Sequence, residues 1–118
     1  MRIPDPLAAR AHGIPFGGFL QTARWGRFDE NKVWHGTRIP SEGELRFLAN
    51  LHLLYGADNL TDFLYWSRSG TRPDQRMPGV FDGLMTEDGK RTQLYTDAQR
   101  IHGEVQAAAK YLLPCSLE

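Results

Sequence analysis

Two neighbouring carboxylates, Asp29 and Glu30, are the residues of this chain whose types first suggest acid–base chemistry. A catalytic acid or base needs a pKa that a desolvated cleft has tuned. Arg27 and Lys32 flank this pair closely, and such a mixture of charges is typical of a solvated loop. The sequence therefore identifies no catalytic carboxylate pair, and the catalytic residues, if any, stay unknown.

Other kinds of reactive centre have little support. The four histidines, at positions 12, 35, 52 and 102, lack the spacing of a metal site. The pair Gly17-Gly18 has no helix directly after it, so it does not predict a phosphate cradle. No Ser-His-Asp or Cys-His arrangement is indicated, and the single cysteine, Cys115, excludes an intrachain disulfide. We predict no metal and no cofactor.

Aromatic and amide side chains are the better candidates for ligand contact. Trp66 and Gln21 each end an expected strand, where an indole can stack on a sugar ring and an amide can bond to a hydroxyl. The alternatives are core packing for Trp66 and a bond to a neighbouring strand for Gln21. Trp25 and Trp34 occupy one long loop, where they either line a cleft or anchor the loop.

Four further polar residues have simpler expectations. His35, beside Trp34, is the one histidine with a candidate substrate role. His52 and His102 fall on apolar helix faces and are expected to be packed. Asp62 lies within a strand, and a buried aspartate needs a hydrogen-bonding partner.

Four elements must position these residues, and they alternate between strand and helix. Apolar runs bounded by turn residues predict two strands, and apolar residues at intervals of three and four predict two helices. Ser41 and Glu44 have the spacing of a capping box, Gly56 is expected to end the first helix, and Thr92 is expected to cap the second. The expected elements are strands 14–22 and 58–66, helices 41–56 and 92–113, long loops 23–40 and 67–91, a connector 1–13 and a tail 114–118.

The order of these elements predicts an α/β fold. Short joins from helix to strand and long joins from strand to helix are the asymmetry of a (β/α)8 barrel, whose active site lies on the side of the long joins. We therefore expect two consecutive βα units, incomplete as a barrel on their own. Residues 14–113 would form these units as a single domain.

Composition narrows the range of partners. The chain has 118 residues, and its fourteen basic side chains balance fourteen acidic ones. A neutral chain has no net field to attract nucleic acid or an anionic membrane, so neither is expected as a partner. No apolar run approaches the roughly 20 residues that a membrane-spanning helix needs.

The segment PSEGELRFLANLHLLYGADNLTDFLYWS and the later segment GLMTEDGKRTQLYTDAQRIHGEV carry a family resemblance. They resemble the last helix–strand–helix passage of clan A glycoside hydrolases, particularly the β-galactosidases of family 42 and related glycosidase-like proteins. FLQT, upstream, resembles a seventh strand that ends in Gln-Thr. The resemblance covers roughly residues 14–113 and implies the seventh and eighth βα units of a barrel. The matching residues of the first segment are Pro40, Ser41, Glu44, Leu45, Arg46, Gly56, Ala57, Asp58, Phe63, Tyr65 and Trp66.

Two departures from the family pattern bear on function. Retaining members carry a nucleophilic glutamate at the end of the seventh strand, where this chain has Leu20 and Gln21. The general acid of the family lies on the fourth strand, which has no counterpart here. Glycoside hydrolysis needs two carboxyl groups across the scissile bond. The resemblance thus implies a hydrolase portion that binds carbohydrate and is not catalytic alone.

Two other hypotheses remain open at this stage. The chain is alternatively a non-enzymatic α/β module that binds a partner or self-associates into an oligomer, because two βα units leave sheet faces and edges exposed. In a third hypothesis the two strands pair antiparallel in a stand-alone α+β domain, and the resemblance is accidental.

Overall fold

A computed structural model of the chain describes residues 6–70, 79–112 and 114. Cys115 and the charged residues Arg72, Asp74 and Arg76 lie outside the described residues. The described part contains three helices and six strands. In chain order they are α1 (Pro6–Ala11), β1 (Gly17–Gln21), β2 (Arg24–Phe28), β3 (Trp34–Gly36), α2 (Glu42–Leu54), β4 (Asn59–Phe63), β5 (Arg68–Gly70), β6 (Gly79–Asp82) and α3 (Gln93–Leu112).

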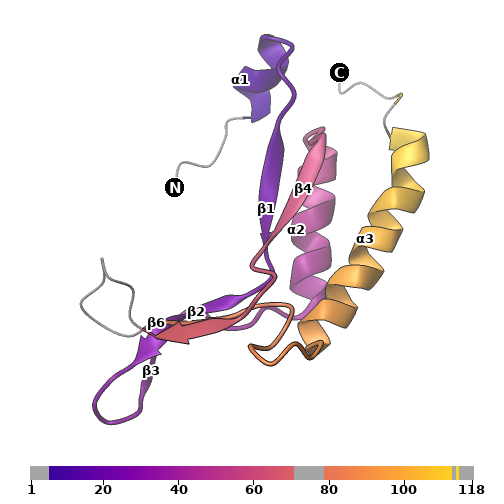
Figure 1. The fold of residues 1–118 in the computed structure, drawn as a ribbon. Coiled ribbons are helices and arrows are strands. Elements are labelled where there is room, and N and C mark those ends of the chain that lie inside the picture. The colour runs from indigo at the N-terminus through magenta and orange to yellow at the C-terminus, as the bar shows by residue number, and fades with distance from the viewer. Residues whose placement is uncertain (1–5, 71–78, 113, 115–118) are drawn as a thin grey trace.

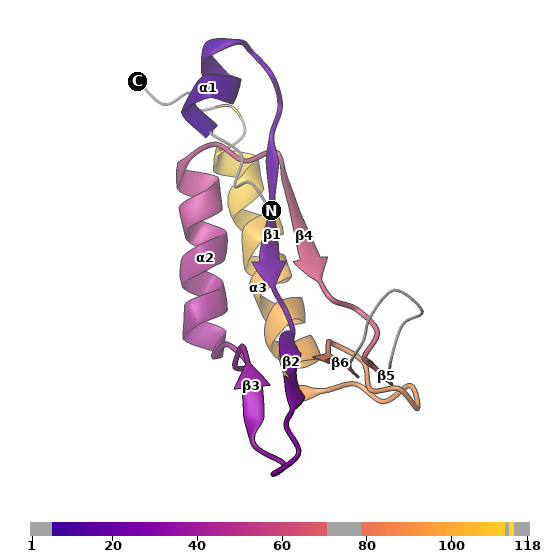
Figure 2. The ribbon, with the colours of Figure 1, turned by 90° about the vertical axis from the view of Figure 1, so that its left-hand side faces the viewer.

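The centre of the fold is a parallel pair of strands, β1 and β4, connected through α2. The register aligns Gly17 with Asn59 and Gln21 with Phe63. Figures 1 and 2 show α2 and α3 on one face of this pair, while no described element covers the other face. The chain is therefore a mixed α/β protein, and the hypothesis of antiparallel pairing between these two strands is wrong.

The core lies between the parallel pair and the two helices. Because side chains alternate along a strand, Leu20 points into this layer and is 1% exposed, whereas its neighbour Phe19 is 55% exposed. Each of the two helices contributes one apolar stripe, as the spacing of its apolar residues by three and four predicts. The cluster consists of Leu20, Leu45, Ala49, Leu84, Leu94, Ala98 and Ile101.

Both predicted helix starts are confirmed. The Glu44 amide donates to Ser41 Oγ at 3.2 Å, and the Ser41 amide donates to Glu44 Oε2 at 2.8 Å, which is a complete capping box. At α3 the Tyr95 amide donates to Thr92 Oγ1 at 3.3 Å. Gly56 has a φ of +81° directly after α2, the left-handed conformation expected of a residue that ends a helix.

Ion pairs connect the two helices on their solvent side. Arg46 Nε lies 2.8 Å from Glu104 Oε2, and Arg100 pairs with Glu42. Together with the buried stripe they set α3 alongside α2. No helix in the described part of the chain is long and apolar enough to cross a membrane.

The predicted long loops are wrong in part, because both contain strands. Segment 23–40 forms the hairpin of β2 and β3, and segment 67–91 contributes β5 and β6. These four strands make one antiparallel sheet in the order β3-β2-β6-β5. Each strand is short, and the pairing of β2 with β6 joins the two segments, so neither segment alone carries a strong strand pattern.

The end of the second predicted strand also needs correction. Strand β4 ends at Phe63, and Tyr65 and Trp66 beyond it are 54% and 49% exposed. A buried run at 63–66 was expected of a parallel strand covered on both faces. The described elements cover only one face of the pair, and Tyr65 and Trp66 lie beyond its end, so neither is buried within it.

Candidate functional site

The antiparallel sheet stands at the carboxyl ends of β1 and β4. Only Thr22 and Ala23, both fully buried, separate β1 from β2. Strand β6 pairs with β2, so the segments that follow β1 and β4 meet in one surface (Figure 1). Ligands of open α/β sheets bind outside the carboxyl ends of the strands. This end of the molecule is therefore the natural place to look for a site.

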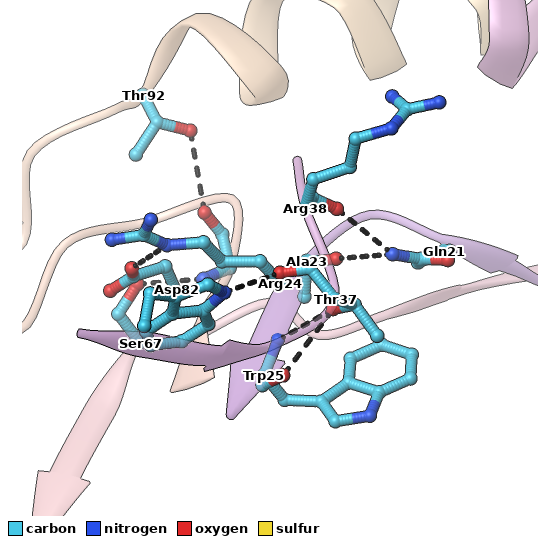
Figure 3. Close-up of polar contacts among 11 residues, drawn as sticks. Gln21, Ala23, Arg24, Trp25, Thr37, Arg38, Ser67, Asp82 and Thr92 are labelled. Atoms are coloured by element: carbon cyan, nitrogen blue, oxygen red, sulfur yellow. Dashed lines mark hydrogen bonds and ion pairs between the residues drawn. The ribbon is translucent and has the colours of Figure 1, made fainter. Parts of the chain in front are cut away.

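Trp34 and Thr37 fix the hairpin of β2 and β3 to its own base. Trp34 Nε1 donates to the Thr37 carbonyl at 2.9 Å, and the Trp25 amide donates to Thr37 Oγ1 at 2.9 Å (Figure 3). The Arg24 guanidinium lies 4.5 Å from the centre of the Trp34 ring. The same guanidinium donates through Nε to Asp82 Oδ2 at 2.6 Å, which ties β2 to β6. Trp34 thus anchors the hairpin, one of its two predicted roles.

Trp25 belongs to a different face of the same sheet. It lies opposite Phe81 in the register, and the Arg68 guanidinium lies 4.8 Å from the Phe81 ring centre. The Trp25 and Phe63 rings meet edge to face with centres 5.6 Å apart. A half-buried row of π systems with one cation therefore borders the end of β4, which is suited to flat, partly apolar ligands.

A cleft opens beside the end of β1 and the start of α2. It has a volume of about 640 Å³, within the range of small-molecule sites. Gln21 reaches it and donates through Nε2 to the carbonyls of Ala23 at 3.1 Å and Arg38 at 3.2 Å (Figure 3). Phe47, 65% exposed, forms an apolar wall. We call this space the Gln21 cleft; its lining is Gln21, Thr37, Arg38, Pro40, Ser41, Gly43, Glu44, Phe47 and Leu48.

A charged pair, Arg38 and Glu44, lies in the wall of the Gln21 cleft. Arg38 Nη1 donates to Glu44 Oε2 at 2.7 Å, and the second nitrogen of the guanidinium bonds to the other oxygen. The hydrogen bonds from Arg38, and then from the Ser41 amide, lower the pKa of Glu44 from 4.5 to about 2. Glu44 therefore accepts hydrogen bonds at neutral pH and has no proton to donate.

The loop carboxylate Asp29 is held in the same way. His35 Nε2 lies 2.8 Å from Asp29 Oδ2, and the amides of Asn31 and Val33 donate to Oδ1. The bond from His35, followed by the bond from Val33, lowers the pKa of Asp29 below its ordinary value of 3.8. Asp29 and His35 thus close the tip of the hairpin, and this carboxylate is poorly suited to act as an acid.

The structure separates the remaining predicted residues from this cleft. Trp66 bridges to Met85 and lies beside the turn at Gly89, away from the residues that line the Gln21 cleft. A second cleft, of about 520 Å³, lies between β6 and the start of α3 and includes Ser67, Asp82 and Thr92. Ser67 Oγ accepts from the buried Gly83 amide, so this cleft is built on a fixed hydroxyl.

Of the nine residues that line the Gln21 cleft, only Gln21 was predicted as a site residue; the aromatic ring and the charged pair of its wall were not predicted. In the sequence, Phe47 is one more apolar residue of a predicted helix. Arg38 is a charged residue of a predicted loop, and Glu44 is part of the predicted capping box. The only sequence signal was that Glu44 sits close to the long loop that holds the candidate tryptophans.

Asp62, His102 and His52 have the packed positions expected of them. Asp62 Oδ2 lies 2.8 Å from His102 Nε2, and His52 Nδ1 lies 2.7 Å from the Leu48 carbonyl. Within the described ranges, no group of three or more His, Cys, Asp or Glu residues has the arrangement of a metal site.

Comparison with known proteins returns no relative: no family model, no curated protein and no solved structure matches this chain. The geometry of the chain itself must therefore carry any functional argument.

Proposed function

We propose that this chain is the C-terminal portion of a glycoside hydrolase-like (β/α)8 barrel, and that it contributes carbohydrate-binding residues to the active-site cleft. In this proposal β1 and β4 are the seventh and eighth strands of the barrel. The carrying observation is that both segments after the parallel strands fold into one surface at the carboxyl ends of those strands.

The chemistry of the Gln21 cleft supports a sugar as the ligand. A sugar ring presents apolar C–H faces and a rim of hydroxyls, so its sites combine an aromatic wall with planar polar groups. The cleft offers the exposed ring of Phe47, the amide of Gln21 and the fork of Arg38 with its partner Glu44. Most of these polar groups are already held by hydrogen bonds, so their side chains lose less conformational entropy when a ligand binds.

The carboxylates favour binding over cleavage. The pKa of Glu44 is about 2, and the pKa of Asp29 is also lowered, so both are ionised acceptors at neutral pH. A glycosidase needs one carboxylic acid that is still protonated when the glycosidic oxygen leaves. The proposed role is therefore to hold the sugar, while another part of the barrel would supply the acid.

Titration of the 118-residue chain with lactose tests this proposal, because lactose is a β-galactoside. Isothermal calorimetry and the NMR signals of the cleft amides report binding, and glycerol at matched concentration is the negative control. Phe47→Ala should weaken lactose binding roughly tenfold, since it removes an apolar contact worth more than 1 kcal/mol. Leu54→Ala is the matched control, because Leu54 is 61% exposed on the same helix but does not line the cleft. Binding that Leu54→Ala weakens as much as Phe47→Ala would rule out the cleft.

A second candidate function is association with a partner or with another copy of the chain. The face of the parallel pair that turns away from the helices carries Phe19 and Phe63, which are 55% and 37% exposed. Parallel sheets are normally buried on both faces. Sedimentation over a hundredfold range of concentration tests self-association: a mass that rises with concentration, and returns to that of a monomer in Phe19→Ser, supports it. A constant monomer mass excludes it.

A further inference from the structure

A third concave region lies at the opposite end of β4, where that strand begins. Helices α2 and α3 are held together near their ion pairs and diverge toward their C-terminal ends (Figure 1). The space between them has a volume of about 430 Å³. Its walls include Leu53 from α2, Leu60 from β4 and Val105 from α3. We call this space the wedge; it shares no lining residue with the Gln21 cleft.

A hydrogen bond to Asp62 orients His102, one of the polar residues of the wedge, and one carboxylate oxygen of Asp62 has no hydrogen bond among the described residues. His102 lines the wedge, and its Nε2 lies 2.8 Å from Asp62 Oδ2. The side chain of Asp62 is only 20% exposed, and its Oδ1 is buried with no hydrogen bond among the described residues. A carboxylate that accepts from one ring nitrogen fixes the tautomer of a neutral histidine. In a neutral ring with this bond, Nε2 is the donor and Nδ1 carries a lone pair.

This arrangement defines the chemistry of a ligand. The wedge is lined by aliphatic side chains together with a few polar groups, which is the usual composition of a small-molecule site. No hydrogen bond to His102 Nδ1 is found in the part of the chain that the structure describes. An apolar molecule that carries one O–H or N–H group could fill the wedge and donate to that nitrogen. We propose that the wedge is a binding site for a small aromatic or aliphatic alcohol, separate from the carbohydrate surface.

Phenol is a suitable probe because it combines an apolar ring with one hydroxyl donor, and toluene has nearly the same shape without the donor. The ring signals of the four histidines in an NMR titration report where phenol binds. His102 should shift in a saturable manner, with a dissociation constant of about 1 mM for a ligand of this size. His35, at the hairpin tip, should not shift. Toluene should bind about fivefold more weakly, the worth of one hydrogen bond.

Two alanines of α3 provide matched variants. Ala109 lines the wedge, whereas Ala107 is exposed on the same helix and does not line it. Ala109→Leu should fill the space and weaken phenol binding at least tenfold, and Ala107→Leu should bind as the unmodified chain does. Circular dichroism of both variants checks that α3 is retained, and Ala109→Val is the smaller change if Ala109→Leu fails to fold.

Three results would overturn the proposal. One is the lack of a saturable shift at His102. Another is phenol binding that Ala109→Leu, or Ala109→Val in its place, leaves unchanged. The third is a dissociation constant for toluene equal to that of phenol, which would show that the His102 nitrogen accepts no hydrogen bond from the ligand. The phenol site in the wedge and the lactose site in the Gln21 cleft share no lining residue. Failure of phenol to bind would therefore leave the carbohydrate proposal standing.

Discussion

Gly18→Ala should destabilise the chain through a single contact beneath β1. A Cβ atom at position 18 would lie 2.1 Å from His52 Nε2 and 2.2 Å from His52 Cδ2. The imidazole cannot turn away freely, because its Nδ1 is bonded to the Leu48 carbonyl at 2.7 Å. Overpacking of this kind costs about 1–3 kcal/mol, and loss of the histidine bond adds about 1 kcal/mol. We therefore expect unfolding free energy to fall by about 2–4 kcal/mol.

Urea unfolding followed by circular dichroism measures this change as a lower midpoint. Gly103→Ala is the matched control: apart from the local backbone of α3, no described atom lies within 4 Å of a Cβ at position 103, so the same substitution should gain about 1 kcal/mol of helix propensity. The double variant Gly18→Ala/His52→Ala should recover part of the loss, because removing the imidazole removes the clash. A Gly18→Ala midpoint equal to that of the unmodified chain would refute the packing of His52 under β1.

Three further predictions concern the core, the capping box and its charge. Leu45→Ala, at a side chain that is 0% exposed, should lower the free energy of unfolding by about 3 kcal/mol in the same urea assay, and a loss below 1 kcal/mol would contradict its central place in the core. Ser41→Ala should lower it by about 1 kcal/mol, because the Glu44 amide loses its acceptor, and Asn50→Ala on the exposed face of α2 is the control. The lowered pKa of Glu44 stabilises the folded chain above about pH 4.5, and this contribution should disappear as the pH falls toward 2. Urea midpoints at pH 7 and pH 3 should therefore differ less for Glu44→Gln than for the unmodified chain, and equal differences would show that the Arg38 pair does not form.

Local signals in the sequence predicted local structure well. The capping box at Ser41 and Glu44 depends on residues three apart, and the apolar spacing of Leu94, Ala98 and Ile101 follows from the helix period alone. These features need no information about the rest of the chain. The parallel pairing of the two strands also follows from the alternation of strand and helix.

Non-local pairing could not be predicted in the same way. Strands β2 and β6 are held together by Arg24 and Asp82, which are 58 residues apart in sequence. Nothing near Arg24 indicates that partner, so the segment read as a loop. The Gln21 cleft was missed for a related reason: its walls come from the end of β1, the loop before α2 and the start of α2, and no local pattern shows that Phe47 faces this space.

The junction of β2 with β6 has a consequence for how the molecule forms. Only two residues lie between the end of β1 and the start of β2. The partner of β2, strand β6, however, lies more than 50 residues further along the chain, after α2 and β4. Contacts this distant must overcome a large loop-closure entropy before they add stability, and they slow folding. Helix α2 and the parallel pair can consolidate first, while the surface at the carboxyl ends waits for residues 79–82. In a chain emerging from the ribosome, the surface at the carboxyl ends of the parallel strands would therefore become native only after β6 has emerged, late in synthesis, as would the part of the core that α3 supplies.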